Sequence, residues 1–195
     1  MPILLLKENQ LRRRRKAIIM RLPYVEPQDP VTEVIRKRRG GELLDLDRTL
    51  LHSIPLAQGW NSMMGTIRTG LVLSADIREL AILRIAILNE ASYEWDQHVE
   101  EGRAAGLTEP QLESIRSFQS ETSPLSEKQK AALVYTDAMT TSIRVPDSIF
   151  SHLRSHFDDR HIVELTATIA SYNMVSRFLV ALDVGERDAS VKTTA

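Results

Sequence analysis

The segment from Ala75 to about Glu90 has the pattern of a helix that is apolar around nearly its whole circumference. Ser74 can cap its start. Its apolar residues are Ile77, Leu80, Ala81, Leu83, Ile85, Ala86, Ile87 and Leu88. A helix at the surface needs only one apolar face, so other parts of the chain must cover this one. We therefore predict a buried helix at the centre of the fold.

Start and stop signals divide the rest of the chain into further helices. Asp29–Pro30 predicts a helix start and Gly40–Gly41 its end. Thr108–Gln111 and Ser126–Gln129 each fit a capping box. Other helices are predicted over residues 43–53 (ended by Pro55), 56–69, 92–105 and 158–182, with a short one after Pro146. No segment has a strand pattern, so the predicted fold is an all-α bundle, whose two halves could be related.

Length and composition are ordinary for one soluble domain. The chain has 195 residues, of which 43% are apolar and 26% charged. We expect a basic, poorly ordered arm over residues 1–28, one helical domain over residues 29–187 and a loose tail over residues 188–195. No apolar run approaches the roughly 20 residues that span a bilayer, and no signal peptide is recognisable. The sequence thus predicts a cytoplasmic protein without a membrane partner.

The net charge of −1 hides a division between a basic and an acidic region. Residues 1–41 hold 11 Lys and Arg against 4 acidic residues, whereas the remainder holds 14 basic and 22 acidic residues. The run Arg12–Lys16 is a solvated terminus in the simplest interpretation, and a mitochondrial targeting arm or a nucleic-acid contact in the alternatives. No aromatic residue is interleaved with these arginines, so no nucleic-acid partner is predicted.

Glu94 and His98 are the polar pair that most needs an explanation. Their i,i+4 spacing places them on one helix face, which also carries small residues, whereas Tyr93 and Asp96 lie on the opposite, predicted water side. An imidazole can give and take protons near neutral pH. Glu94, one turn away, is expected to fix the tautomer of the ring. Glu79, on the preceding helix, could orient the ring or serve as a second base.

Other polar side chains on apolar helices are candidate substrate ligands. Asn173 and Arg177 lie one turn apart on one such helix and Arg84 lies in the middle of another, so each is costly to bury unless it has a partner or a ligand. Asn173 and Arg177 could equally form a structural pair. Trp60 could line a pocket or pack in the core, and His52 could belong to a pocket or to an interface.

Cysteine is absent, which excludes disulfides, thiolate metal sites and thiol redox chemistry. His152 and His156 are one turn apart, with His161, Asp158 and Asp159 close by. This stretch is strongly polar and contains no H-E-x-x-H pattern, so we interpret it as a solvated surface. No metal and no other cofactor is predicted.

Three segments carry a resemblance to a known family. Leu80–Ala86, Tyr93–His98 and Ala104–Thr108 together resemble the carboxymuconolactone decarboxylase family, which shares its all-helical fold with the alkylhydroperoxidase D-like proteins. The resemblance covers roughly residues 41–185. The Glu-Trp-x-x-His element is fairly specific in combination with the Gly-Leu-Thr turn that follows it.

The resemblance implies which chemistry is lost and which is kept. In the peroxidase branch of the superfamily, a Cys-x-x-Cys pair is followed four residues later by a histidine, and His98 matches that histidine. Ala91 and Glu94 stand at the two cysteine positions, and Glu79 looks like the proton-relay glutamate of the preceding helix. Thiol peroxidase chemistry is therefore excluded, because it needs a thiolate.

The same resemblance implies a cofactor-free decarboxylase or isomerase for a small carboxylated lactone or a related enolisable compound. His98, Glu94 and Glu79 would be its catalytic residues, and its substrate-binding residues would be Arg84, Asn173, Arg177, His52 and Trp60. The alternatives are an isomerase or cyclase of specialised metabolism and a non-catalytic helical oligomer. Superfamily members form rings of three or six, so a homo-oligomer (trimer, hexamer or dimer) is predicted, with residues 43–64 as a candidate contact surface.

Overall fold

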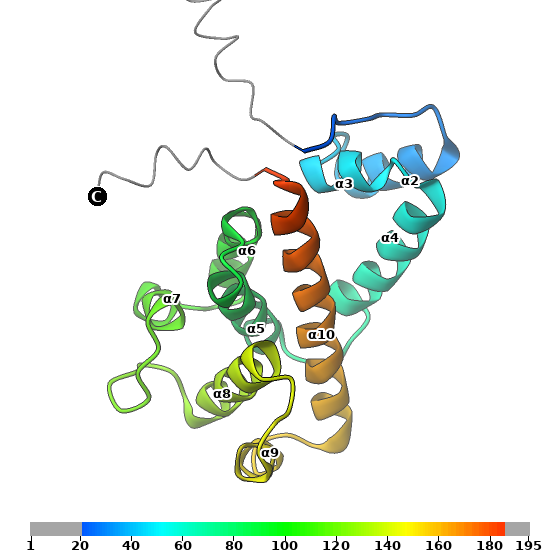
Figure 1. The fold of residues 1–195 in the computed structure, drawn as a ribbon. Coiled ribbons are helices and arrows are strands. Elements are labelled where there is room, and N and C mark those ends of the chain that lie inside the picture. The colour runs from blue at the N-terminus through cyan, green and yellow to red at the C-terminus, as the bar shows by residue number, and fades with distance from the viewer. Residues whose placement is uncertain (1–20, 186–195) are drawn as a thin grey trace, which may run out of the picture.

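The computed structural model of the protein describes residues 21–185, and within that range it contains helices and no strand (Figure 1). The prediction of an all-α fold is confirmed. The helices are α2 (Pro30–Arg38), α3 (Asp45–Leu50), α4 (Ile54–Thr69), α5 (Ala75–Leu88), α6 (Ser92–Ala104), α7 (Glu109–Arg116), α8 (Glu127–Thr141), α9 (Asp147–Arg154) and α10 (Asp159–Leu182).

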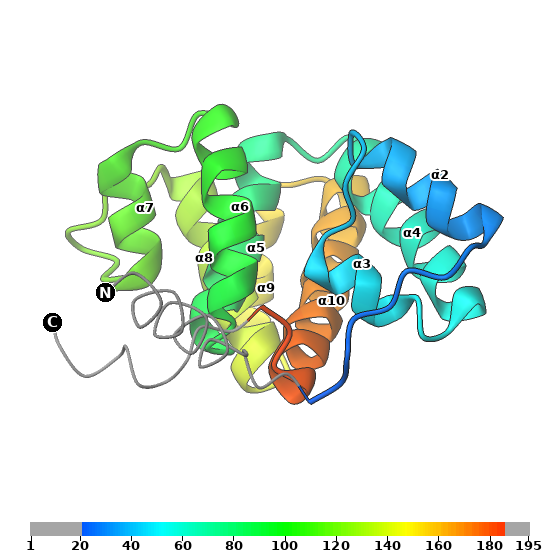
Figure 2. The same ribbon diagram turned by 90° about the horizontal axis from the view of Figure 1, so that it is seen from above.

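The long helix α10 separates two groups of helices. On one side lie α5 to α9, and on the other lie α2, α3 and α4 (Figure 2). Helix α5 packs against α6, α8 and α10. Leu80, Ala81, Ile82 and Leu83 on α5 have no exposed surface, which is the outcome expected for a helix that is apolar on all sides. The prediction of a central, buried helix over these residues is confirmed.

Most of the helix boundaries follow from the predicted caps. The side chain of Asp29 accepts a hydrogen bond from the backbone N–H of Val31 at 2.8 Å, and the side chain of Asp158 caps α10 in the same way. Pro55 is a correction, because it was expected to end a helix and instead stands in the first turn of α4. A proline is tolerated there because the N–H groups of a first turn have no partner within the helix.

Helix α10 was not expected to be long and apolar enough to cross a membrane, yet by length and composition it is the one described helix that meets this criterion. Core helices of soluble proteins meet it too. Helix α10 packs against α4, α5 and α8. Its Glu164 is buried and accepts the backbone N–H groups of Val72 and Leu73 at 2.9 and 2.8 Å. We therefore interpret α10 as a core helix.

The predicted terminal segments are described only in part. Residues 1–20 of the predicted arm and the tail over residues 188–195 lie outside the described residues. Within the described part of the arm, Arg21 donates to Asp183 at 2.8 Å, and the backbone N–H of Val25 donates to the carbonyl of Arg48 at 3.4 Å. Residues 21–28 thus lie against the ends of α3 and α10.

Candidate active site

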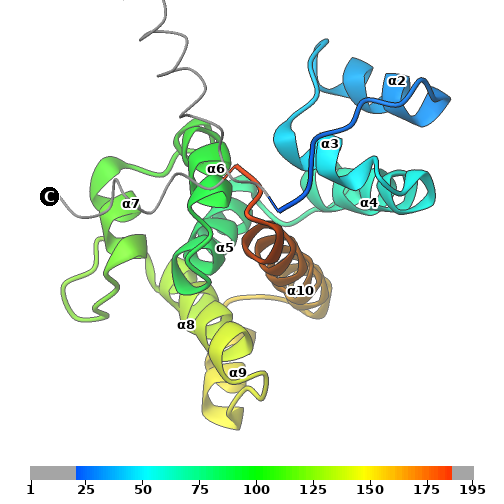
Figure 3. The same cartoon turned by 45° about the horizontal axis from the view of Figure 1, so that its top comes forward.

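A cavity of about 520 Å³ lies where α4, α5, α6 and α10 meet the segment before α3. Figure 3 shows α10 between α4 on one side and α5 and α6 on the other. The apolar residues that line the cavity are Leu44, Leu46, Trp60, Met64, Val175 and Leu179. The other residues that line it are Arg39, Arg68, Thr69, Arg78, Glu79, Tyr93, Glu94, Gln97, His98, Glu101 and Tyr172. The volume suits a small organic molecule. All three residues predicted to be catalytic line this cavity.

His98 is oriented by Glu79 rather than by Glu94. The Nδ1 atom of His98 lies 2.8 Å from Oε2 of Glu79, and Nε of Arg78 donates to the other oxygen, Oε1 of Glu79, at 3.1 Å. This corrects the expectation that Glu94 would fix the tautomer. With Nδ1 committed to Glu79, Nε2 is the ring nitrogen that has no hydrogen bond to a described residue and can meet a ligand.

Glu94 is buried without a hydrogen-bond partner. Its exposed fraction is 2%, and neither carboxyl oxygen bonds to any described residue. Burial raises the pKa of Glu94 well above its ordinary value, because the charged form would lose its solvation. Glu94 is therefore an acid that keeps its proton at a higher pH than an exposed glutamate would.

Tyr172 completes the floor of the cavity from α10. Its ring meets the ring of His98 edge to face, with centroids 5.1 Å apart. The hydroxyl is buried and has no hydrogen-bond partner among the described residues. Burial raises the pKa of Tyr172, as do the charges of Glu79 and Glu94, and nearby Arg68 offsets part of that rise. The hydroxyl is thus a protonated donor that points at no protein acceptor.

Tyr93 was expected on the water side of its helix and instead is half-buried and lines the cavity. Burial, followed by the charge of Asp45, raises the pKa of Tyr93 to about 12. Gly185 packs directly against this ring. A Cβ at Gly185 would lie 2.1 Å from Cδ2 of Tyr93, and its φ of +63° also favours glycine. The chain just after α10 therefore packs against the ring of Tyr93.

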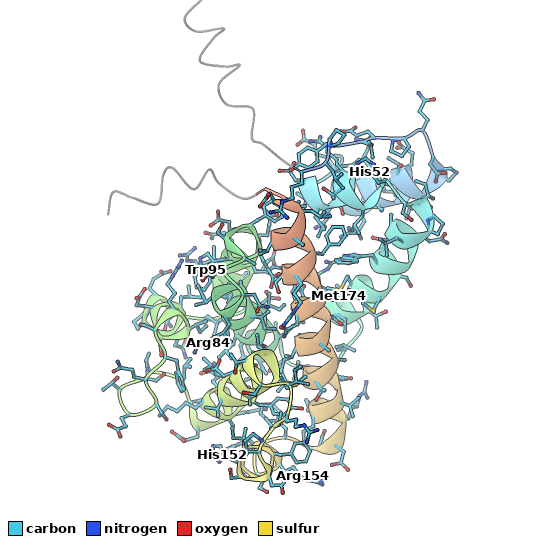
Figure 4. The ribbon with its side chains drawn as sticks, viewed as in Figure 1. His52, Arg84, Trp95, His152, Arg154 and Met174 are labelled. Atoms are coloured by element: carbon cyan, nitrogen blue, oxygen red, sulfur yellow. The ribbon has the colours of Figure 1, made fainter. Side chains whose placement is uncertain are left out.

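Arg84 does not reach the cavity, which corrects its predicted role in substrate binding. Its Nε and Nη2 atoms donate to the two oxygens of Asp137 at 2.6 and 2.8 Å, and Nη1 donates to the carbonyl of Ile115 at 2.8 Å. The ion pair ties α5 to α8, and Figure 4 shows Arg84 on the side of α7 and α8. The charge of Arg84 is already matched within the protein.

Asn173 and Arg177 also lie outside the cavity. Asn173 donates to Thr140 and to the carbonyl of Ile169, both at 3.0 Å, and accepts from Asn89 at 3.1 Å. Arg177 is exposed and hydrogen-bonds to the side chain and the carbonyl of Asn173. Of the two interpretations left open, the geometry favours the structural pair over the substrate ligands.

Of the two remaining candidates, Trp60 lines the cavity and His52 does not. Nε2 of His52 lies 2.7 Å from the carbonyl oxygen of Pro23, and Figure 4 shows the residue near α3, where it does not line the cavity. Trp60 does line the cavity, with its ring 5.3 Å from that of Phe178.

The histidines near α9 contact one another or a neighbouring carboxylate. The rings of His152 and His156 meet edge to face with centroids 5.1 Å apart, and His161 hydrogen-bonds to Asp158 at 2.7 Å. Across residues 21–185, no group of three or more His, Asp or Glu side chains could hold a metal ion.

Sequence reasoning missed several polar residues that line the cavity, among them Arg68 and Tyr172. Arg68 stands in the last turn of α4, where a basic residue is also explained by the helix dipole. Tyr172 lies on the same helix as Asn173 and Arg177, and its position in the sequence gave no sign of which of the three residues faces the cavity. Only the packing of α4 against α10 brings the two residues to one cavity.

Three comparisons relate the chain to known proteins. Residues 55–138 match the carboxymuconolactone decarboxylase family. The uncharacterized protein YdfG of Bacillus subtilis is 31% identical over 115 residues, which cover 58% of this chain and 76% of YdfG.

Two solved structures share the fold. One is an uncharacterized peroxidase-related protein of Ralstonia eutropha, described as an alkylhydroperoxidase AhpD core, with a TM-score of 0.75, 17% identity and coverage of 88% of this chain and 94% of that one. The other is a cysteine-to-alanine variant of the debrominase Bmp8 in complex with 2,3,4-tribromopyrrole, with a TM-score of 0.69, 19% identity and coverage of 89% and 96%.

Proposed function

The chain belongs to the carboxymuconolactone decarboxylase family, and from that premise we propose that it is a cofactor-free acid/base enzyme. Its substrate would be a small carboxylated lactone or a related enolisable compound, and its reaction a decarboxylation or an isomerisation. Thiol chemistry is excluded because the chain has no cysteine.

The observation that carries the proposal is the state of Glu94. A buried carboxyl group with neither oxygen hydrogen-bonded is costly to the fold, and such groups gather at functional sites. Glu94 is one of the residues that line a cavity that also contains an oriented histidine. A neutral carboxylic acid can donate a hydrogen bond to an oxygen on which negative charge develops.

The geometry supports a division of roles. In decarboxylation, the bond between the carboxylate carbon and the ring breaks, CO₂ leaves and the electron pair delocalises onto the lactone carbonyl as an enolate. The carboxyl group of Glu94 would donate to the enolate oxygen. His98, through Nε2, would deliver a proton to the ring carbon. Glu79 would hold the ring and balance its positive charge, with Arg78 on its other oxygen.

Isomerisation would use the same groups. His98 would remove a proton next to the carbonyl and return it elsewhere on the conjugated system, while Glu94 stabilises the same enolate. An isomerase or cyclase of specialised metabolism therefore remains an alternative within this proposal. The product separates the two reactions, because only decarboxylation releases CO₂.

The test uses His98→Ala, with His156→Ala as a matched control from outside the cavity and circular dichroism to check the fold. Purified proteins are incubated with a panel of carboxylated butenolides in D₂O, and loss of the carboxylate and uptake of deuterium are followed by NMR. We expect His98→Ala to lose about 100-fold or more in rate, and His156→Ala to match the wild type. Full activity of the folded His98→Ala variant would contradict the role of His98 as the acid/base residue.

The competing hypothesis is a non-catalytic helical oligomer. A closed site with His98 saturated by protein partners would favour it, whereas the open cavity and the unbonded Glu94 favour catalysis. Homo-oligomerisation itself stays a prediction. Leu56 and Met63 on α4, with exposed fractions of 48% and 42%, support residues 43–64 as a contact surface.

A further inference from the structure

We infer that Arg68 and Tyr172 form the subsite that binds the carboxylate of a monocyclic organic acid in this cavity. The inference rests on the proposed function, for which it supplies the anionic anchor that Arg84 and Arg177 do not provide. Both residues line the cavity, and they reach it from α4 and α10 respectively.

Arg68 differs from the other cations of the cavity in having no anionic partner. Arg39 donates to both oxygens of Asp47 at 2.9 and 3.2 Å, and Arg78 donates to Glu79 at 3.1 Å. Arg68 forms no ion pair with any carboxylate of residues 21–185. Its guanidinium is therefore the described cation of the cavity whose charge is open to a ligand.

The surroundings of Arg68 have an excess of positive charge. Burial, Arg39 and Arg68 together lower the pKa of Arg38 to about 10, although Asp47 acts against them. Three guanidinium groups thus influence one another, while Asp47 is the carboxylate that pairs with Arg38 and Arg39. An anion at Arg68 would offset this repulsion.

Tyr172 supplies a second donor next to Arg68. Its ring is fully buried, its hydroxyl donates to no acceptor among the described residues, and the Arg68 guanidinium is close enough to lower its pKa. A carboxylate has two oxygens and can accept from a guanidinium and from a hydroxyl at once. Binding would satisfy a buried donor whose lack of a partner costs free energy in the empty protein.

The remaining walls indicate the rest of the ligand. Trp60, Met64 and Val175 form an apolar surface, and Glu94 and His98 lie on the neighbouring helix α6. An apolar ring would pack on Trp60, Met64 and Val175 while its anionic group contacts Arg68. The site thus takes a ring that carries one carboxylate, and would bind the corresponding neutral amide weakly.

The experiment compares 2-furoate with 2-furamide, which have the same ring and differ in charge. Binding to the full chain is measured by ligand-detected NMR titration for the wild type, Arg68→Gln, Tyr172→Phe and Arg177→Gln. Charge-assisted hydrogen bonds predict a loss of about tenfold or more for Arg68→Gln, and a smaller loss for Tyr172→Phe. Arg177→Gln, an exposed arginine outside the cavity, should bind like the wild type.

Several outcomes would overturn the inference. They are equal binding of furoate and furamide, unchanged furoate affinity in folded Arg68→Gln, an equal loss in Arg177→Gln, and no saturable binding of furoate to the wild type. Arg68→Lys should restore part of the affinity, which separates loss of charge from misfolding. Because furoate is tested for binding and not for turnover, a negative result here is distinct from a negative result with His98→Ala.

Discussion

Two polar clusters lie within the helical core, and they differ in how far the protein satisfies them. Around Asn173, the side-chain amide bonds to Thr140, Ile169 and Asn89, and Asn89 also donates to Ser176 at 2.6 Å. Around the cavity, Glu94 and Tyr172 are at least as deeply buried and have no partner. Burial of a polar residue therefore does not identify a site. A better indication of a site is a group of buried polar atoms beside a cavity that have no hydrogen-bond partner in the protein.

Substitution of Arg84 has the largest expected effect on stability, because its guanidinium is fully paired within the protein. Arg84→Met removes three hydrogen bonds and leaves Asp137, 29% exposed, without its counter-charge. We expect the free energy of unfolding to fall by about 2–3 kcal/mol, as measured by urea denaturation. Furoate affinity of the folded variant should be unchanged.

A matched control for Arg84 is the exposed pair of Arg154 and Asp159. Arg154→Met breaks an ion pair whose side chains are 58% and 84% exposed, so its cost should stay below about 1 kcal/mol. A stable Arg84→Met variant that loses furoate affinity would contradict the comparison and return Arg84 to the substrate site.

Much of the fold was predictable because its signals are local. The Asp29 and Asp158 caps, the capping boxes at Thr108 and Ser126, and the apolar circumference of α5 each depend on residues close together in the chain. The error at Pro55 has a local cause too, because a proline can end one helix or begin the next.

The site was predictable only where helical spacing sufficed. His98 and Glu79 were identified from the pattern and the resemblance, and they meet as expected at 2.8 Å. Arg84 and Arg177 were chosen because they interrupt apolar helices, but their partners come from outside the patterns that suggested them. Arg68 could not be chosen from sequence, since its distinguishing feature is the lack of a partner in three dimensions.

Glu94 predicts an unusual dependence of stability on pH. Its pKa is raised in the folded state, so between the unfolded value near 4.3 and the folded value the native state binds more protons than the unfolded state. The contribution of Glu94 is fully present below the unfolded pKa and is lost as pH rises through the folded pKa. Relative to Glu94→Gln, the wild type should lose up to about 1.4 kcal/mol per pH unit in this window.

The measurement is urea denaturation of both proteins at a series of pH values above 4. Glu101→Gln, an exposed glutamate of the same helix, is the control and should follow the wild type. Parallel curves for the wild type and Glu94→Gln would mean that Glu94 ionises in the folded protein as it does in the unfolded chain. The proposal that Glu94 acts as a neutral acid would then be wrong.

Asn173 should give the smallest change, and it tests the satisfied cluster directly. Asn173→Ala removes the side-chain hydrogen bonds to Thr140 and Asn89, but Asn89 keeps its hydrogen bond to Ser176. We expect a loss of about 1 kcal/mol in the free energy of unfolding, with catalytic rate and furoate affinity unchanged. If Asn173→Ala instead lowered the rate while leaving stability intact, a fully bonded polar group would have a role in the chemistry. Hydrogen-bond saturation would then no longer distinguish the two clusters.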